Sequence, residues 1–134
     1  MDDSPYLLNA QQQQSVSGLS AEKRYRYFVG RVADCGELWG LRDDGGWVMS
    51  GDGTGVQYFP VWPHPKFAET CARDEWNGNQ PSRIELAAWM DRWLPGMAHD
   101  GKRVQVFPVV GCKGWLADPV GLKEDLGDEL GKIE

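Results

Sequence analysis

The first repeating apolar pattern in the chain predicts a helix after residue 20. Apolar side chains recur at steps of four and three residues, which places them on one helical face: Ala21, Tyr25, Phe28, Val29 and Val32. Ser20 is a favourable N-cap, and Gly36 is typical of a helix end. The opposite face carries basic residues, namely Lys23, Arg24, Arg26 and Arg31. We therefore expect an amphipathic helix here.

Short apolar runs separated by turn residues predict a β-meander next. The runs cover residues 38–41, 47–50 and 56–62, and Asp- and Gly-rich turns stand between them. Pro63 and Pro65 then favour a helix start, because a proline at the first helical position gives up no hydrogen bond. The apolar stripe of that helix is Phe67, Ala68, Cys71 and Ala72.

The second half of the chain repeats this mixture of strands and helices. We expect a short strand at 83–86, a helix over 86–94 that ends at Pro95 and Gly96, strands at 104–107 and 115–117, and a last helix after Asp118-Pro119. The element order predicts an α+β fold, with a mixed or antiparallel sheet of about five to six strands and helices packed mostly on one of its faces.

The first 19 residues have a different composition from the rest. Gln11 to Gln14 stand in a row and are followed by Ser15, Ser17 and Gly18. Polar tracts of this kind bury little apolar surface, so we expect residues 1–19 to be a flexible N-terminal tail, although Tyr6, Leu7 and Leu8 can dock. Residues 20–134 are then a single α+β domain, which suits a chain of 134 residues.

The charge balance bears on the kind of partner. With 20 acidic and 14 basic residues the net charge is −6, which argues against nucleic acid and favours a basic protein partner. No apolar run approaches the roughly 20 residues of a membrane helix, and no secretory signal is visible, so we expect a cytoplasmic protein. The oligomeric state is open.

Few residues carry recognisable chemistry. The spacing of Cys35, Cys71 and Cys112 indicates neither a disulfide framework nor a zinc site, so we predict no metal and no cofactor. His64 and Cys71 are seven residues apart, and a Cys–His pair is conceivable. Because Cys71 falls on an apolar stripe, a buried structural thiol is the favoured interpretation.

Partner contacts are predicted at two places. One is the Trp62-Pro63-His64-Pro65 junction, together with Trp76 beside an Asn-Gly turn, because tryptophan is enriched in binding hot spots. The other is the last helix, which carries six acids and two bases from Asp118 to Glu134. Its candidate contacts are Glu124, Asp125, Asp128 and Glu129. The alternatives are core packing for the tryptophans and a solvated face for the acids.

Several runs resemble a bacterial family known as domain of unknown function number 2750. The most specific run is Phe59 to Ala68, and the others cover residues 24–28, 37–41, 46–47, 93–97, 106–108 and 118–119. The resemblance spans roughly residues 20–134 and implies no reaction. The layout of a strand, a Pro-Val-aromatic turn and a helix is also similar to SseB-type domains associated with bacterial secretion proteins, which bears on fold only.

These observations lead to two functional hypotheses. The first is a non-enzymatic protein-binding domain, of which an immunity-type protein or a secretion-associated accessory protein would be specific versions. The alternative is a small hydrolase or ligand-binding domain that uses His64 with Cys71, or a pocket lined by Trp62 and Trp76.

Overall fold

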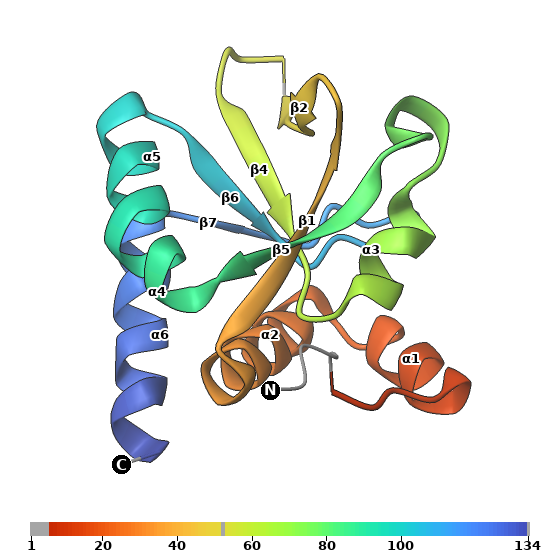
Figure 1. Ribbon diagram of the computed structural model, residues 1–134, viewed down its shortest axis with the longest axis horizontal. Helices are drawn as coiled ribbons and strands as arrows, with labels where there is room; N and C mark the ends of the chain where they lie inside the picture. Colours follow the sequence, from red (N-terminus) through yellow and green to blue (C-terminus); the bar gives the residue numbers. More distant parts are fainter. Residues whose placement is uncertain (1–5, 52, 134) are drawn as a thin grey trace.

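The strands are divided between two sheets that helices surround (Figure 1). The computed structural model describes residues 6–51 and 53–133. The three-stranded sheet has the order β2-β1-β5, with β1 (Glu37–Asp43), β2 (Gly46–Trp47) and β5 (Gln80–Glu85). The four-stranded sheet has the order β3-β4-β6-β7, with β3 (Ser50–Gly51), β4 (Gln57–Val61), β6 (Arg103–Val106) and β7 (Trp115–Ala117). The α+β class is confirmed.

One pair of tryptophans joins the two sheets. The backbone N–H of Trp39 donates to the Trp62 carbonyl at 2.9 Å, and the Trp62 N–H donates to the Trp39 carbonyl at 2.8 Å. β4 and β6 are parallel, whereas the other paired strands are antiparallel. The strands therefore form a mixed arrangement, and the predicted strand at 47–50 is split because β2 and β3 belong to different sheets.

The first predicted helix is confirmed as α2 (Ala21–Cys35). The Ser20 hydroxyl accepts a hydrogen bond from the Lys23 N–H at 3.2 Å, and Gly36 ends the helix in the left-handed conformation with φ 74°. Phe28 and Val32 are fully buried in the core. Local signals were therefore sufficient to place both ends of this element.

A continuous helical segment runs from Leu86 to Asp100, past the predicted end at Pro95-Gly96. It consists of α4 (Leu86–Ala88), a π-helical stretch (Trp89–Trp93) and α5 (Leu94–Asp100). The predicted end was wrong because the wide π-helical turn precedes Pro95, and such bulges relieve the crowding that a proline causes in a regular helix. Gly101 ends the segment with φ 73°.

The N-terminal segment contains a helix that the sequence did not predict, α1 (Ala10–Ser17). Asn9 forms a capping box with Gln12: the Asn9 Oδ1 accepts from the Gln12 N–H at 2.8 Å, and the Gln12 Oε1 accepts from the Asn9 N–H at 3.0 Å. Leu8 is buried in the core cluster. Residues 6–19 thus differ from a structureless tail, because the capping box stabilises α1 and Leu8 packs in the core. Residues 1–5 of the predicted tail lie outside the described residues, and the flexibility of the segment in solution stays a prediction.

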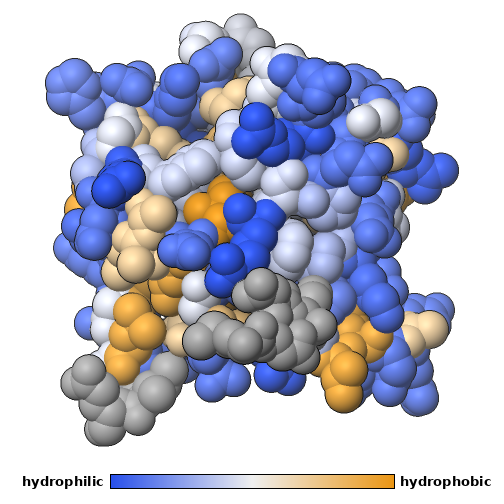
Figure 2. Space-filling model, in the orientation of Figure 1, coloured by the Kyte–Doolittle hydropathy of each residue, from blue (hydrophilic) through white to orange (hydrophobic). Residues whose placement is uncertain are grey.

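The remaining helices are α3 (Pro65–Cys71), a short 3₁₀ turn (Asp74–Trp76) and α6 (Pro119–Ile133). Figure 1 shows α4, α5 and α6 on one side of the strands, α2 below them, and α1 and α3 on the other side, so the helices do not gather mostly on one face. None of the described helices has the length and hydropathy to cross a membrane. The face in Figure 2 is mostly hydrophilic, with small separate hydrophobic spots.

Candidate functional site

His64 is a structural residue in the junction formed by residues 62–65. It is 4% exposed, and it is the N-cap of α3, with its Nδ1 accepting from the Lys66 N–H at 3.1 Å. Its Nε2 lies 2.8 Å from the Tyr6 carbonyl, to which it donates in the neutral tautomer that this pattern requires. Burial lowers the pKa of His64, the Lys66 charge acts in the same direction, and the Tyr6 carbonyl opposes both. Both ring nitrogens are therefore occupied within the fold.

Cys71 and Trp62 share a backbone acceptor in the core. The Trp62 Nε1 donates to the Pro108 carbonyl at 2.8 Å, and the Cys71 Sγ donates to the same oxygen at 3.4 Å. Burial raises the pKa of Cys71 to about 11, so the thiol is protonated near neutrality. Neither nitrogen of His64 is free to deprotonate it. These contacts give no support to a His64–Cys71 catalytic pair.

Trp62 and His64 therefore offer no surface to a partner in this structure, in contrast to their predicted role as contacts. Trp62 is fully buried, and its ring lies edge-on against Trp76 with centroids 6.1 Å apart. The fixed φ angles of its two prolines restrict the backbone of this junction. The side chains of Trp62 and His64 are both buried in the fold. Of the three residues predicted here, only Trp76 is partly exposed.

Trp76 borders a pocket of about 420 Å³ that two cysteines also line. Cys112 is exposed, and its Sγ accepts a hydrogen bond from the Arg24 Nη2 at 3.0 Å. The Gly114 N–H and the Arg24 guanidinium lower the pKa of Cys112, against the opposing effect of burial. Gly114 has φ 78°, and a Cβ on it would lie 2.4 Å from the Val106 carbonyl, so this turn requires glycine.

The sequence placed Arg24 on the basic face of α2, opposite the apolar one, but the structure buries it. It is 3% exposed, and its Nε donates to the Phe107 carbonyl at 3.2 Å. Its Nη1 donates to the Leu19 carbonyl. Arg24 thus stabilises the chain around the Cys112 turn, and it is not available to an outside partner.

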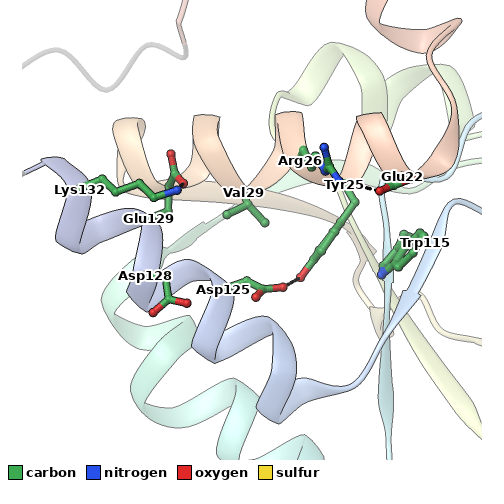
Figure 3. Close-up of a pocket in the computed structure, with 9 residues that line it drawn as sticks. All are labelled: Glu22, Tyr25, Arg26, Val29, Trp115, Asp125, Asp128, Glu129 and Lys132. Atoms are coloured by element: carbon green, nitrogen blue, oxygen red, sulfur yellow. Dashed lines mark hydrogen bonds and ion pairs between the residues drawn. The ribbon is translucent and has the colours of Figure 1, made fainter.

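A second pocket, of about 490 Å³, lies between α2 and α6 (Figure 3). We call it the α2–α6 groove. Its lining comes from α2, β7 and α6, and consists of Glu22, Tyr25, Arg26, Val29, Trp115, Asp125, Asp128, Glu129 and Lys132. Three of the four acids predicted on the last helix are therefore gathered in one groove. The fourth, Glu124, is exposed and does not line it.

Two aromatic rings form one end of the groove. The Trp115 and Tyr25 rings are nearly parallel, at 9°, with centroids 5.6 Å apart. The Tyr25 hydroxyl crosses the groove and donates to the Asp125 Oδ2 at 2.5 Å (Figure 3). Burial and this contact with Asp125 raise the pKa of Tyr25, so the phenol stays protonated. Tyr25 is buried, whereas Trp115 is 40% exposed at the groove's edge.

The charges in the groove are not balanced. Glu22 is paired with Arg26 at 2.7 Å, and Glu129 lies 3.5 Å from Lys132. Among the described residues, Asp125 accepts a hydrogen bond only from the neutral Tyr25 hydroxyl, and Asp128 has neither a hydrogen bond nor an ion pair. The excess negative charge of the groove therefore lies on Asp125 and Asp128. They are three residues apart on α6, a spacing that makes them neighbours on one helix face.

The sequence indicated these acids but not the aromatic end of the groove. Tyr25 was placed on the apolar face of α2, and Trp115 in a strand, and nothing local connects either residue to α6. Tyr25 and Asp125 are 100 residues apart in the chain. Only the packing of α2 against α6 brings them together.

A family comparison bears on the chain as a whole. A family model described as a protein of unknown function, DUF2750, matches residues 25–126. The chain belongs to this family. The DUF2750 match includes Tyr25, Trp115 and Asp125 of the groove and ends two residues before Asp128. No curated protein matches the chain, and no solved structure matches it. The layout similarity to SseB-type domains stays a prediction.

Proposed function

We propose that this DUF2750 protein is a non-enzymatic binding domain that docks a basic segment of another protein in the α2–α6 groove. The observation that carries the proposal is the pair of carboxylates, Asp125 and Asp128, which have no cationic partner in the described chain and line the same groove as the half-exposed Trp115. A basic segment would supply the missing positive charge and cover the indole at the same time.

The physical case rests on complementarity. Opposite charges steer the approach of a partner and select against acidic competitors, an effect that the overall charge of −6 reinforces. A tryptophan at the end of a groove supplies a large apolar contact, and tryptophan is the residue type most typical of binding hot spots. The carboxylates would give the interaction its selectivity, and Trp115 would supply much of its buried area.

The specific versions of this proposal, an immunity-type protein or a secretion-associated accessory protein, differ in their partner. An immunity-type protein would cover a basic surface on a toxin, and an accessory protein would hold a basic segment of a secreted protein. A cytoplasmic location stays a prediction in both versions. The groove supports the chemistry that the two versions share, which is the docking of positive charge.

The test is a calorimetric titration with a short lysine peptide, at low and at high salt. We expect binding that weakens as salt rises, because the charges involved are near the surface. The double variant Asp125→Asn/Asp128→Asn should lose this binding, and Glu124→Gln, on the same helix but outside the groove, should keep it. Equal affinity of both variants would contradict the proposal.

A further inference from the structure

We infer that residues 6–16 are a detachable clasp, and that the surface they cover on α2 and α3 is a docking surface for an extended tyrosine-x-leucine segment. The chain's own Tyr6 and Leu8 occupy this surface in the closed state described above. The inference goes beyond the proposed function and does not depend on it. Among the described residues, no hydrogen bond or ring contact of the clasp involves a residue that lines the α2–α6 groove.

The first residues of the clasp lie on the domain as an extended peptide does. Leu8 is 7% exposed and packs in the core cluster, Leu7 is 95% exposed, and Tyr6 is partly buried. Successive side chains of an extended chain point in opposite directions, so Tyr6 and Leu8 face the domain and Leu7 faces solvent. The surface therefore selects an aromatic residue and a leucine that are two positions apart.

The surface also bonds the backbone of the segment. The His64 Nε2 lies 2.8 Å from the Tyr6 carbonyl, to which it donates. The Lys66 Nζ donates to the Leu8 carbonyl at 2.7 Å. Because every peptide has carbonyl groups, these two donors would hold any segment that follows the same path.

The Tyr6 side chain supplies the specific part of the contact. Its hydroxyl and that of Tyr27 share a hydrogen bond of 2.9 Å, and the Arg31 guanidinium lies 4.6 Å from the centroid of its ring. The His64 ring packs edge-on against the Tyr6 ring, with centroids 4.8 Å apart. A phenylalanine would keep the ring contacts and lose the hydroxyl bond, so the surface should prefer tyrosine.

The rest of the clasp is less firmly attached. α1 lies beside α3 (Figure 1), and none of its residues is buried. Among the described residues, the hydrogen bonds that join these two helices come from Gln13. A pocket of about 280 Å³ separates the clasp from Tyr27 and Arg31 of α2. A short helix is marginal by itself in water, so α1 depends on the docking of Tyr6 and Leu8.

The end of the clasp has a natural hinge at Gly18. The buried Arg24 donates to the carbonyls of Ser17 and Leu19, which holds the chain on either side of Gly18 against the domain. The DUF2750 match begins at residue 25, so the clasp lies outside the matched residues and the surface that it covers lies inside them. Opening about Gly18 would therefore uncover the docking surface and leave the matched domain intact.

The first experiment is hydrogen exchange, followed by mass spectrometry, on the full chain with Tyr6→Ala/Leu8→Ala. We expect α1 to exchange roughly tenfold faster or more, with β1 and β5 unchanged, because local opening affects only the clasp. The matched control is Leu7→Ala, which should exchange as the wild type does. Faster exchange throughout β1 and β5 would show that the segment is part of the core. That result would overturn the inference, as would equal exchange in the two variants.

The second experiment is a calorimetric titration of Tyr6→Ala/Leu8→Ala with a synthetic peptide that has the sequence of residues 6–19. We expect the peptide to bind this variant and to bind the wild-type protein roughly tenfold more weakly or less, because the tethered clasp competes at a high effective concentration. The same peptide with both substitutions should not bind. If the two peptides bind the variant equally, or if neither binds, the surface is not a docking surface and the inference is wrong.

Discussion

The junction around His64 and the groove beside Asp128 differ in where their polar atoms find partners. In the junction, the Trp62 indole, both nitrogens of His64 and the Cys71 thiol are all bonded inside the fold. In the groove, Asp128 is exposed and has no partner among the described residues. Both regions contain residue types that are common in functional sites. Only the groove has a polar side chain that is still available to bind a partner.

This difference separates residues that stabilise the fold from residues that can bind. A buried polar atom that loses its partner costs about 1–3 kcal/mol, so the junction is constrained by stability. A solvated carboxylate on a helix face contributes little to folding, so the groove is free to serve an external ligand. Substitutions in the junction should therefore lower the stability of the fold, whereas substitutions of the groove's acids should lower binding and leave stability nearly unchanged.

The largest expected effect is on folding, at Trp62. Trp62→Ala should lower the free energy of unfolding by roughly 3–5 kcal/mol, because it leaves a cavity in the core and removes the bond to the Pro108 carbonyl. Trp115→Ala, in the half-exposed ring, should cost far less. Urea denaturation of both variants measures the difference, and equal costs would contradict the assignment of Trp62 to the core.

The second effect is on thiol reactivity. The pKa of Cys71 is raised to about 11, and that of Cys112 is lowered from its ordinary value. At pH 7 the thiolate fraction of Cys112 should therefore exceed that of Cys71 by roughly 100-fold or more, and burial of Cys71 adds to the difference. Labelling with iodoacetamide, followed by peptide mass spectrometry, gives the two rates. Comparable rates for the two cysteines would show that Cys71 is accessible to solvent and would contradict its burial.

The third effect is the pH dependence of stability at His64. Its pKa is lower in the folded state than in the unfolded chain, where it is about 6.5, so the folded state binds the proton less well. The contribution of neutral His64 is fully present above about pH 6.5 and is lost as the pH falls below that value. His64→Asn can still cap α3 and does not titrate, so it should flatten this part of the stability profile.

His99 provides the matched control for that experiment. Its side chain is 89% exposed and its nearest ionic contact is Asp100 at 3.3 Å. His99→Asn should therefore leave the decline below pH 6.5 unchanged. Urea denaturation across the pH range measures the profiles, and a wild-type profile that the His64→Asn variant reproduces would contradict the structural role of His64.

The smallest expected effect on folding is at Asp128. Asp128→Asn should change the free energy of unfolding by no more than about 0.5 kcal/mol, because its side chain contacts no partner in the described chain. The same variant should weaken the binding of a basic peptide. Thermal denaturation and calorimetry on one sample give both numbers. A large loss of stability with unchanged binding would show that Asp128 stabilises the fold and does not bind the peptide, which would contradict the role assigned to the groove.

Local signals in the sequence predicted much of the fold. Ser20 and Gly36 placed the ends of α2, and Asp118-Pro119 predicted the start of α6. The helix past Pro95 was missed because a π-helical turn has no clear sequence signature. The helix α1 was missed because a glutamine-rich tract suggests disorder, whereas here Asn9 caps it and Leu8 anchors the preceding chain.

The candidate site could be predicted only in part from the sequence. Helical spacing places Asp125, Asp128 and Glu129 on neighbouring positions, and the sequence predicted them as contacts. Their aromatic neighbours come from α2 and β7, and His64 is fixed by Tyr6, 58 residues away. Contacts of this range depend on tertiary packing, which no local pattern encodes.

The most direct test of the α2–α6 groove as a binding surface is hydrogen exchange, followed by mass spectrometry, with and without the short lysine peptide. We predict that added protection is confined to α2, β7 and α6, and that it disappears in Asp125→Asn/Asp128→Asn. Protection centred instead on residues 62–76, with α6 unchanged, would show that the junction is the binding surface and would contradict this account.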